Sequence, residues 1–147
     1  MNIVIACDHA GVALKKLIIE HFSEISFDDV GTDSEESCDY PDYISKAGMK
    51  IFNKEAESGI VICGTGLGAS IVANKFPGIR AALCTNEFMA EMSRRHNNSN
   101  VLALGSRVIG SDLALAIVRT WLDTPFEGGR HQRRLDKISA LEKNVRG

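Results

Sequence analysis

The chain has 147 residues, of which 44% are hydrophobic and 24% charged, a composition typical of one folded domain and unlike that of disordered or fibrous proteins. Its formal net charge of −2 disfavours a nucleic-acid binder that works through bulk positive charge. No apolar run approaches the roughly 20 residues that a membrane span needs, and Asp8 comes too early for a signal peptide. We therefore expect a cytoplasmic protein of one domain, residues 1–147, with no membrane or nucleic-acid partner.

Short apolar runs alternate with stretches of helical period along the chain. The expected strands are residues 2–6, 26–30, 59–63, 80–84 and 101–104, and the expected helices are residues 10–22, 43–57, 86–95 and 113–122. Residues 31–41 are polar and predict a loop. This alternation favours a parallel sheet with helices on both faces, because parallel neighbours need crossover connections.

The tail from Gly128 is rich in arginine and lysine, and its few apolar residues (Leu135, Ile138, Leu141) recur at helical spacing. A terminal helix with such a thin apolar stripe needs a neighbour, which predicts packing on a second copy. Arg130 and Arg134 are four residues apart, so one helical face presents both to a single phosphate, and Arg107 is expected to join them. A solvated basic face is the alternative interpretation.

Three segments with chemical groups follow expected strands directly. They are residues 7–9, residues 63–68 and residues 105–107. Because ligands of open parallel sheets collect beyond the carboxyl ends of the strands, we expect these segments to meet at one edge.

Cys63 and the glycine-rich residues 64–68 form the most informative of these segments. Glycines let the backbone approach a ligand closely, and a nearby helix start suits a phosphate or an oxyanion. The same placement favours the thiolate form of Cys63, a base or nucleophile, and Thr65 offers a hydroxyl to the same centre. The glycine spacing fits neither a dinucleotide fingerprint nor a P-loop, and a plain tight turn is the alternative.

Asp8, His9 and His96 are further candidates. Asp8 and His9 could hold a hydroxyl and an anion, or could form a solvated loop pair. His96 ends an expected helix, where it either acts as a general acid–base or simply interacts with the helix dipole. No histidines or acids have metal-ligand spacing, so we expect no metal and no cofactor, and the four cysteines are expected to be free thiols.

Several of these motifs occur together in one known family. They are Cys7-Asp8-His9-Ala10-Gly11, Asp39-Tyr40-Pro41, Ile62-Cys63-Gly64-Thr65-Gly66-Leu67-Gly68, Ala73-Asn74-Lys75, Arg95-His96-Asn97, Leu104-Gly105-Ser106-Arg107 and Glu127-Gly128-Gly129-Arg130-His131. In this order they resemble the type B ribose-5-phosphate isomerases, whose wider family includes the galactose-6-phosphate isomerase subunits. The resemblance implies a three-layer α/β/α Rossmann-like sandwich with a five-stranded parallel sheet and a C-terminal helix packing on the partner subunit. It also implies a homodimer or a dimer of dimers, active sites between subunits and catalysis without a metal.

The implied reaction interconverts ribose 5-phosphate and ribulose 5-phosphate through a cis-enediolate. By this resemblance, Cys63 would move the proton between C1 and C2, and Thr65 would stabilise the enediolate. His96 would help to open the furanose ring, and Asp8 would assist at the ring oxygen or a hydroxyl. The implied substrate-binding residues are Tyr40 and Asn97 along the sugar, Gly64, Gly66 and Gly68 in the loop, and His9, Arg107, Arg130 and Arg134 at the phosphate.

Two alternatives remain at this point. One is an isomerase of another sugar phosphate, which the pocket near Asp8, Tyr40 and Asn97 would decide. The other is a non-catalytic phosphate-binding module on the same scaffold, because a fold does not fix a function. That module would leave Cys63, Thr65 and His96 unexplained together.

Overall fold

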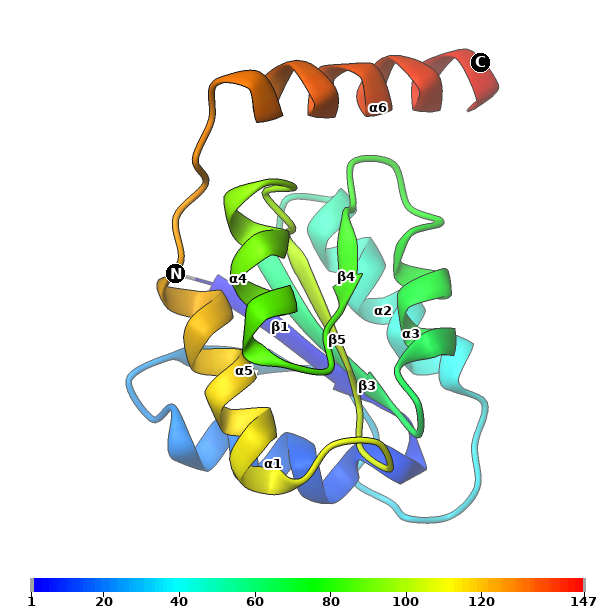
Figure 1. The fold of residues 1–147 in the computed structure, drawn as a ribbon. Coiled ribbons are helices and arrows are strands. Elements are labelled where there is room, and N and C mark those ends of the chain that lie inside the picture. Colours follow the sequence, from blue (N-terminus) through cyan, green and yellow to red (C-terminus); the bar gives the residue numbers. More distant parts are fainter. Residues whose placement is uncertain (1, 147) are drawn as a thin grey trace.

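A computed structural model describes residues 2–146, and five parallel strands form its centre (Figure 1). The strands are β1 (Asn2–Cys7), β2 (Ser26–Asp29), β3 (Ser58–Cys63), β4 (Ala81–Leu83) and β5 (Val101–Gly105), in the spatial order β2-β1-β3-β5-β4. Every neighbouring pair is parallel, as the strand–helix alternation predicts. The expected strand at residues 80–84 is shorter than predicted, because pairing with β5 covers only three residues.

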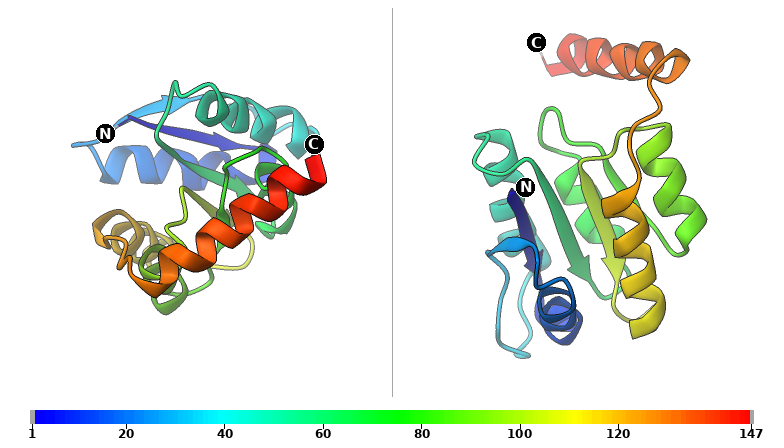
Figure 2. Two further views of the ribbon diagram at one scale, coloured as in Figure 1. Left: turned by 90° about the horizontal axis from the view of Figure 1, so that it is seen from above. Right: turned by 90° about the vertical axis from the view of Figure 1, so that its left-hand side faces the viewer.

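Helices cover both faces of the sheet and confirm the three-layer α/β/α Rossmann-like arrangement (Figures 1 and 2). They are the short 3₁₀ helix η1 (His9–Gly11), α1 (Val12–His21), α2 (Tyr40–Phe52), α3 (Leu67–Ala73), α4 (Glu87–Arg95), α5 (Ser111–Asp123) and α6 (Arg130–Arg146). One buried cluster joins the sheet to α1, α4 and α5, and a second joins it to α2 and α3. Alternating residues of β3 feed the two clusters: Ile60 and Ile62 enter the first, and Val61 and Cys63 enter the second.

The bounds of α2 differ from the predicted helix at both ends. The helix begins at Tyr40 rather than residue 43, because Asp39 precedes it in an extended conformation and Pro41 suits a first turn. It ends at Phe52 rather than residue 57, because Lys54 has a positive φ of 62° that a helix does not continue through. Tyr40 therefore projects from a helix start and not from a loop.

The C-terminal helix α6 lies apart from the layers, beyond the edge at which the strands begin (Figures 1 and 2). Gly128 and Gly129 both have positive φ, 73° and 58°, and turn the chain into it. Only His131 and Leu135 of this helix are buried. Its remaining large apolar side chains stay exposed, namely Ile138, Leu141 and Val145. The apolar stripe thus has no cover within one copy, and its packing on a second copy stays a prediction.

Lys15 of α1 carries an ammonium group with no exposed surface. Its Nζ donates to Asp33 Oδ1 at 2.8 Å, to the Thr32 carbonyl at 2.8 Å and to Asp29 Oδ1 at 3.1 Å. Burial opposes the charge, but the hydrogen bonds to Asp33 and Asp29 outweigh it and raise the pKa of Lys15. Since Thr32 N in turn donates to the Cys7 carbonyl at 3.2 Å, this ammonium fastens the loop after β2 to the end of β1.

We expect Lys15→Ala to lower the free energy of unfolding by about 3 kcal/mol, because it removes a buried, fully hydrogen-bonded charge and leaves the Thr32 carbonyl with only the weak donor Cys7 Sγ at 3.5 Å. Urea denaturation at neutral pH measures the change. The matched control is the exposed neighbour Lys16, whose substitution by alanine should cost no more than about 0.5 kcal/mol. Equal effects of the two substitutions would contradict a structural role for the buried ammonium.

Candidate active site at the two edges of the sheet

The three segments singled out in the sequence lie together at the carboxyl edge of the sheet. Cys63 at the end of β3 pairs with Gly105 at the end of β5, and Cys7 at the end of β1 pairs with Ile62. Ser106 connects the segments: its hydroxyl donates to the Ala10 carbonyl at 2.8 Å, and its backbone N–H donates to the Cys63 carbonyl at 3.0 Å. The sequence placed Ser106 in this edge but assigned it no role.

The glycine-rich loop after β3 is pressed against the end of β5. A Cβ on Gly105 would lie 2.4 Å from the Thr65 carbonyl oxygen, and Gly66 has a φ of 79°. Both positions therefore require glycine for this backbone path. Thr65 is exposed, and its hydroxyl oxygen accepts from Leu67 N at 3.3 Å. The hydroxyl proton of Thr65 remains free to be donated to a ligand.

Cys63 is the least accessible of the candidate groups. Its side chain is 4% exposed and belongs to the apolar cluster beneath α2 and α3. Within one copy this thiol therefore has little surface that a ligand can reach. The thiol nevertheless sits at the last residue of β3, directly before the loop that contains Thr65.

Asp8 and His9 continue from β1 and are both fixed by the backbone. Asp8 is 6% exposed, and its Oδ1 accepts from Ala10 N at 3.0 Å at the start of η1. His9 Nδ1 accepts from Cys38 N at 3.2 Å, so the neutral ring carries its proton on Nε2. This tautomer presents a donor, which suits an anionic oxygen.

Tyr40 and Arg107 flank the loop. A Cβ on Gly68 would lie 2.7 Å from two ring carbons of Tyr40, so the phenol packs directly over this glycine. A Cβ on Gly64 would lie 3.2 Å from Arg107 Nη1, which places the guanidinium over the other end of the loop. We call the group at this edge the strand-end half-site; it comprises Asp8, His9, Tyr40, Cys63, residues 64–68 and Arg107.

The other predicted residues lie at the opposite edge of the sheet. His96 follows α4 as its C-cap, Asn97 comes next, and the chain then enters the start of β5. Exposed Arg130 and Arg134 open α6 near the same edge. We call this group the helix-end half-site; it comprises His96, Asn97, Arg130 and Arg134. Because β5 spans the sheet at roughly 3.3 Å per residue, the two half-sites of one copy are more than about 13 Å apart.

This separation bears on one expectation from the sequence. Arg130 and Arg134 share a helical face as predicted, but Arg107 does not join them within one copy. The physical reason is that α5 lies between Arg107 and α6 and carries the chain back to the edge where strands begin. Within one copy, no single ligand contacts both half-sites.

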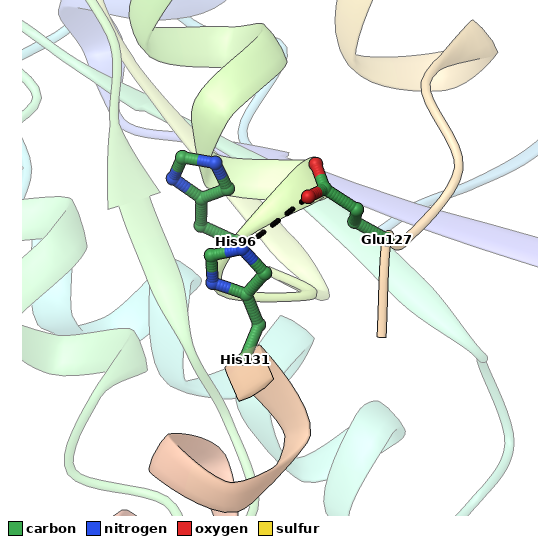
Figure 3. Close-up of side chains that lie close together, drawn as sticks. All are labelled: His96, Glu127 and His131. Carbon is green, nitrogen blue, oxygen red and sulfur yellow. Dashed lines mark ion pairs between the residues drawn. The ribbon is translucent and has the colours of Figure 1, made fainter. Parts of the chain in front are cut away.

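His96, Glu127 and His131 form a further cluster that the sequence did not indicate (Figure 3). Among residues 2–146, their ligand atoms lie within 4.8 Å of one another, which raises the question of a metal site. The His96 and His131 rings are stacked, with centroids 4.2 Å apart and planes 10° apart. Lone pairs of imidazole nitrogens lie in the ring planes, so two parallel rings cannot direct them at one ion. The geometry suits stacking rather than coordination.

The chain has close relatives among known proteins. Residues 3–138 match the family described as ribose/galactose isomerase. Ribose-5-phosphate isomerase B of Escherichia coli is 49% identical over 144 residues, which cover 97% of each chain. The fold matches ribose-5-phosphate isomerase B of Clostridium thermocellum with a TM-score of 0.96 and 53% identity over 99% of both chains. It also matches the Mycoplasma genitalium enzyme with bound ribulose-5-phosphate, with a TM-score of 0.92 and 44% identity over 97% of this chain and 96% of that one.

Among residues 2–146, no helix is both long enough and apolar enough to cross a bilayer.

The environments of the thiols predict selective alkylation. Burial raises the pKa of Cys7 to about 12 and that of Cys84 to about 11. We therefore expect iodoacetamide to leave both unmodified in the folded protein between about pH 6 and pH 9, where almost no thiolate forms on either. Peptide mass spectrometry identifies the modified thiols, and Cys38→Ser removes the half-buried competitor of Cys63. Modification of Cys7 in the folded protein would contradict this account.

Proposed function

The chain belongs to the ribose/galactose isomerase family, and we propose that it interconverts D-ribose 5-phosphate and D-ribulose 5-phosphate. The observation that carries this proposal is the nearly full-length relationship to the E. coli enzyme named ribose-5-phosphate isomerase B. The relative with bound ribulose-5-phosphate has the same fold and supports the same substrate class. In this proposal residues 1–147 act as one sugar-phosphate isomerase domain.

The reaction moves one proton between neighbouring carbons. The Cys63 thiolate removes the proton from C2 of the open-chain aldose, and the electron pair forms the C1–C2 double bond of a cis-enediolate. The negative charge moves onto O1, where the free hydroxyl proton of Thr65 and backbone N–H groups of residues 64–68 stabilise it. The hydroxyl proton of O2 passes to O1, and Cys63 returns its proton to C1 to give the ketose.

The shielding of Cys63 supports this role. A base that is 4% exposed meets little bulk water once a substrate covers the loop. The proton taken from C2 is then held beside C1 and exchanges only slowly with water, and the enediolate is protected from side reactions. A fully exposed thiol at the same strand end would lack both advantages.

The separation of the half-sites gives the assembly a catalytic role. We propose that each active site combines the strand-end half-site of one copy with the helix-end half-site of a second copy. A homodimer is the smallest assembly that provides this, and two dimers can associate further. The exposed apolar stripe of α6 (Ile138, Leu141, Val145) supports such pairing, because burying it against the second copy removes apolar surface from water.

In the combined site each remaining residue has a part in holding or opening the sugar. His96 transfers a proton during opening of the furanose ring, and Asp8 assists at the ring oxygen or a hydroxyl. Tyr40 and Asn97 line the carbon chain. The phosphate is held by one histidine and three arginines, namely His9, Arg107, Arg130 and Arg134. Binding energy from the phosphate holds C1 and C2 at Cys63, which is how a remote group accelerates the proton transfer.

A six-carbon aldose phosphate is a second candidate substrate, because the family that residues 3–138 match includes galactose isomerases by its description. Initial rates with ribose 5-phosphate and with galactose 6-phosphate, measured on the same preparation, decide between them. Faster turnover of the six-carbon substrate would replace the proposed substrate and leave the roles of Cys63 and Thr65 unchanged.

We expect Cys63→Ser to lower kcat by about 10³-fold or more while ribose 5-phosphate still binds, because only the proton transfer is lost. Turnover and equilibrium binding are measured with an excess of a metal chelator, which should leave the wild-type rate unchanged. Cys38→Ser is the matched control and should stay within about twofold of wild type. Binding by the wild type without any turnover would favour the non-catalytic module instead.

Shared active sites predict complementation between two inactive variants. We expect Cys63→Ser and His96→Ala to be nearly inactive alone, and their refolded equimolar mixture to recover about one quarter of wild-type activity. Half of the dimers in the mixture are mixed, and one of the two sites in each mixed dimer is intact. The two variants refolded separately and then assayed together at once serve as the control. Absence of recovery would place both half-sites' functions within one copy and contradict sharing.

A further inference from the structure

We propose that His131 is a positioning residue, which holds the His96 ring in the orientation needed to open the sugar ring and is itself held by Glu127. This inference rests on the proposed isomerase function. It assigns a task to the cluster of Figure 3, of which only His96 has a proposed part in the reaction.

The His96 ring depends on this contact for its orientation. His96 follows the last turn of α4, where its backbone N–H donates to the Met92 carbonyl at 2.9 Å. Among residues 2–146, neither nitrogen of its half-buried ring has a hydrogen-bond partner. The contact that restrains the ring is the stack on His131, with centroids 4.2 Å apart. Stacking fixes the ring plane and leaves both nitrogens free at the ring edge for a substrate.

His131 is well placed to provide that restraint. It is 4% exposed, so the surrounding side chains confine its ring. Its Nε2 has no hydrogen-bond partner in the described part of the chain and lies 3.5 Å from Glu127 Oε1. Figure 3 shows the carboxylate directed at this nitrogen. The ring is therefore set by packing on one side and by a carboxylate on the other.

Glu127 is fixed in its turn by the residue next to His96. Arg95 Nε lies 3.3 Å from Glu127 Oε2, and Glu127 N donates to the Arg95 carbonyl at 3.0 Å. Arg95 also pairs with Glu91 one turn earlier, at 2.9 Å, which anchors its guanidinium to α4. The contacts thus form a closed loop from His96 through His131, Glu127 and Arg95 back to His96. A closed loop of this kind resists rotation of any one member.

Ring opening has a stricter geometric demand than binding. The C1 hydroxyl loses its proton, the bond between C1 and the ring oxygen breaks, and the ring oxygen gains a proton. A histidine takes part only when one of its nitrogens lies in line with the proton that moves. The later transfer between C1 and C2 belongs to Cys63 and does not involve His96. Loss of His131 should therefore slow ring opening and spare the enediolate step.

The experiment measures these two steps separately in His131→Ala. The first measurement is conversion of ribose 5-phosphate, which is mostly a closed ring. The second is incorporation of solvent deuterium at C1 of ribulose 5-phosphate, followed by NMR; this ketose cannot form a furanose, because its 5-hydroxyl carries the phosphate. We expect conversion to fall by about 10- to 100-fold, as for a misplaced catalytic group, and deuterium incorporation to stay within about twofold.

Two further variants distinguish positioning from anchoring of α6. His131→Phe keeps a stacked ring without the nitrogens and should retain much more conversion than His131→Ala. Leu135→Ala removes the other buried side chain of α6 and keeps both histidine rings, so it should loosen the helix and lower both rates together.

Three outcomes of these measurements would contradict the positioning role or the proposed function. A parallel loss of both rates in His131→Ala, matching Leu135→Ala, would mean that His131 merely anchors α6 and would overturn the proposal. Unchanged conversion in His131→Ala would overturn it as well. A wild type that neither converts ribose 5-phosphate nor exchanges the C1 proton would instead refute the proposed function itself.

Discussion

The buried ammonium of Lys15 is the contact on which the carboxyl edge of the sheet depends. Two carboxylates and the Thr32 carbonyl surround this charge, which has no exposed surface. Moving the loop after β2 would leave a buried charge without hydrogen-bond partners, which is energetically costly. The same loop continues to Cys38, whose N–H sets the tautomer of His9, and then to Tyr40 above the glycine-rich loop. The hydrogen-bonded Lys15 thus holds the loop whose later residues contact His9 and the glycine-rich loop.

The division of the site into two half-sites follows from the connectivity of an α/β fold. Strands deliver residues to the carboxyl edge, and each helix carries the chain back to the opposite edge. Residues that follow strands, such as Cys63, and residues that follow helices, such as His96, are therefore separated by the length of the sheet. A second copy is a direct way to bring such residues together. The reaction that we propose uses this by dividing proton transfer and ring opening between the two half-sites.

Much of this arrangement was predictable from the sequence. Five apolar runs located the strands, and the rule for parallel sheets correctly placed Cys7, Cys63 and Gly105 at one edge. The placement of His96 at the other edge was also implicit in the direction of its helix. The resemblance of motifs, however, does not give the distance between His96 and Cys63. The extent of burial of the Cys63 thiol stayed open in the sequence. A free cysteine is often a small buried residue, its place before the glycine-rich loop favoured a reactive one, and alternation along β3 does not reveal how closely α3 covers it.

The remaining omissions concern residues whose type does not suggest their role. Lys15 lies among apolar residues of α1, where a lysine usually extends to solvent, and only the positions of Asp29 and Asp33 explain its burial. His131 and Glu127 are four residues apart in a tail whose basic residues dominate its pattern. Stacking between His96 and His131 joins segments 35 positions apart in sequence, and periodicity contains no information about such pairs.

The chain turns into α6 at Gly128 and Gly129, and two contacts hold the helix against the rest of the structure. The helix α6 extends roughly 25 Å from these glycines, so a rotation of about 10° at the glycines displaces the end of the helix by about 4 Å. Near these glycines the ring of His131 stacks on His96. Farther along the helix, Glu142 Oε1 accepts a hydrogen bond from Gly78 N at 2.9 Å. The direction of α6 thus depends on these two contacts and on the positive φ values of Gly128 and Gly129, which larger amino acids rarely adopt.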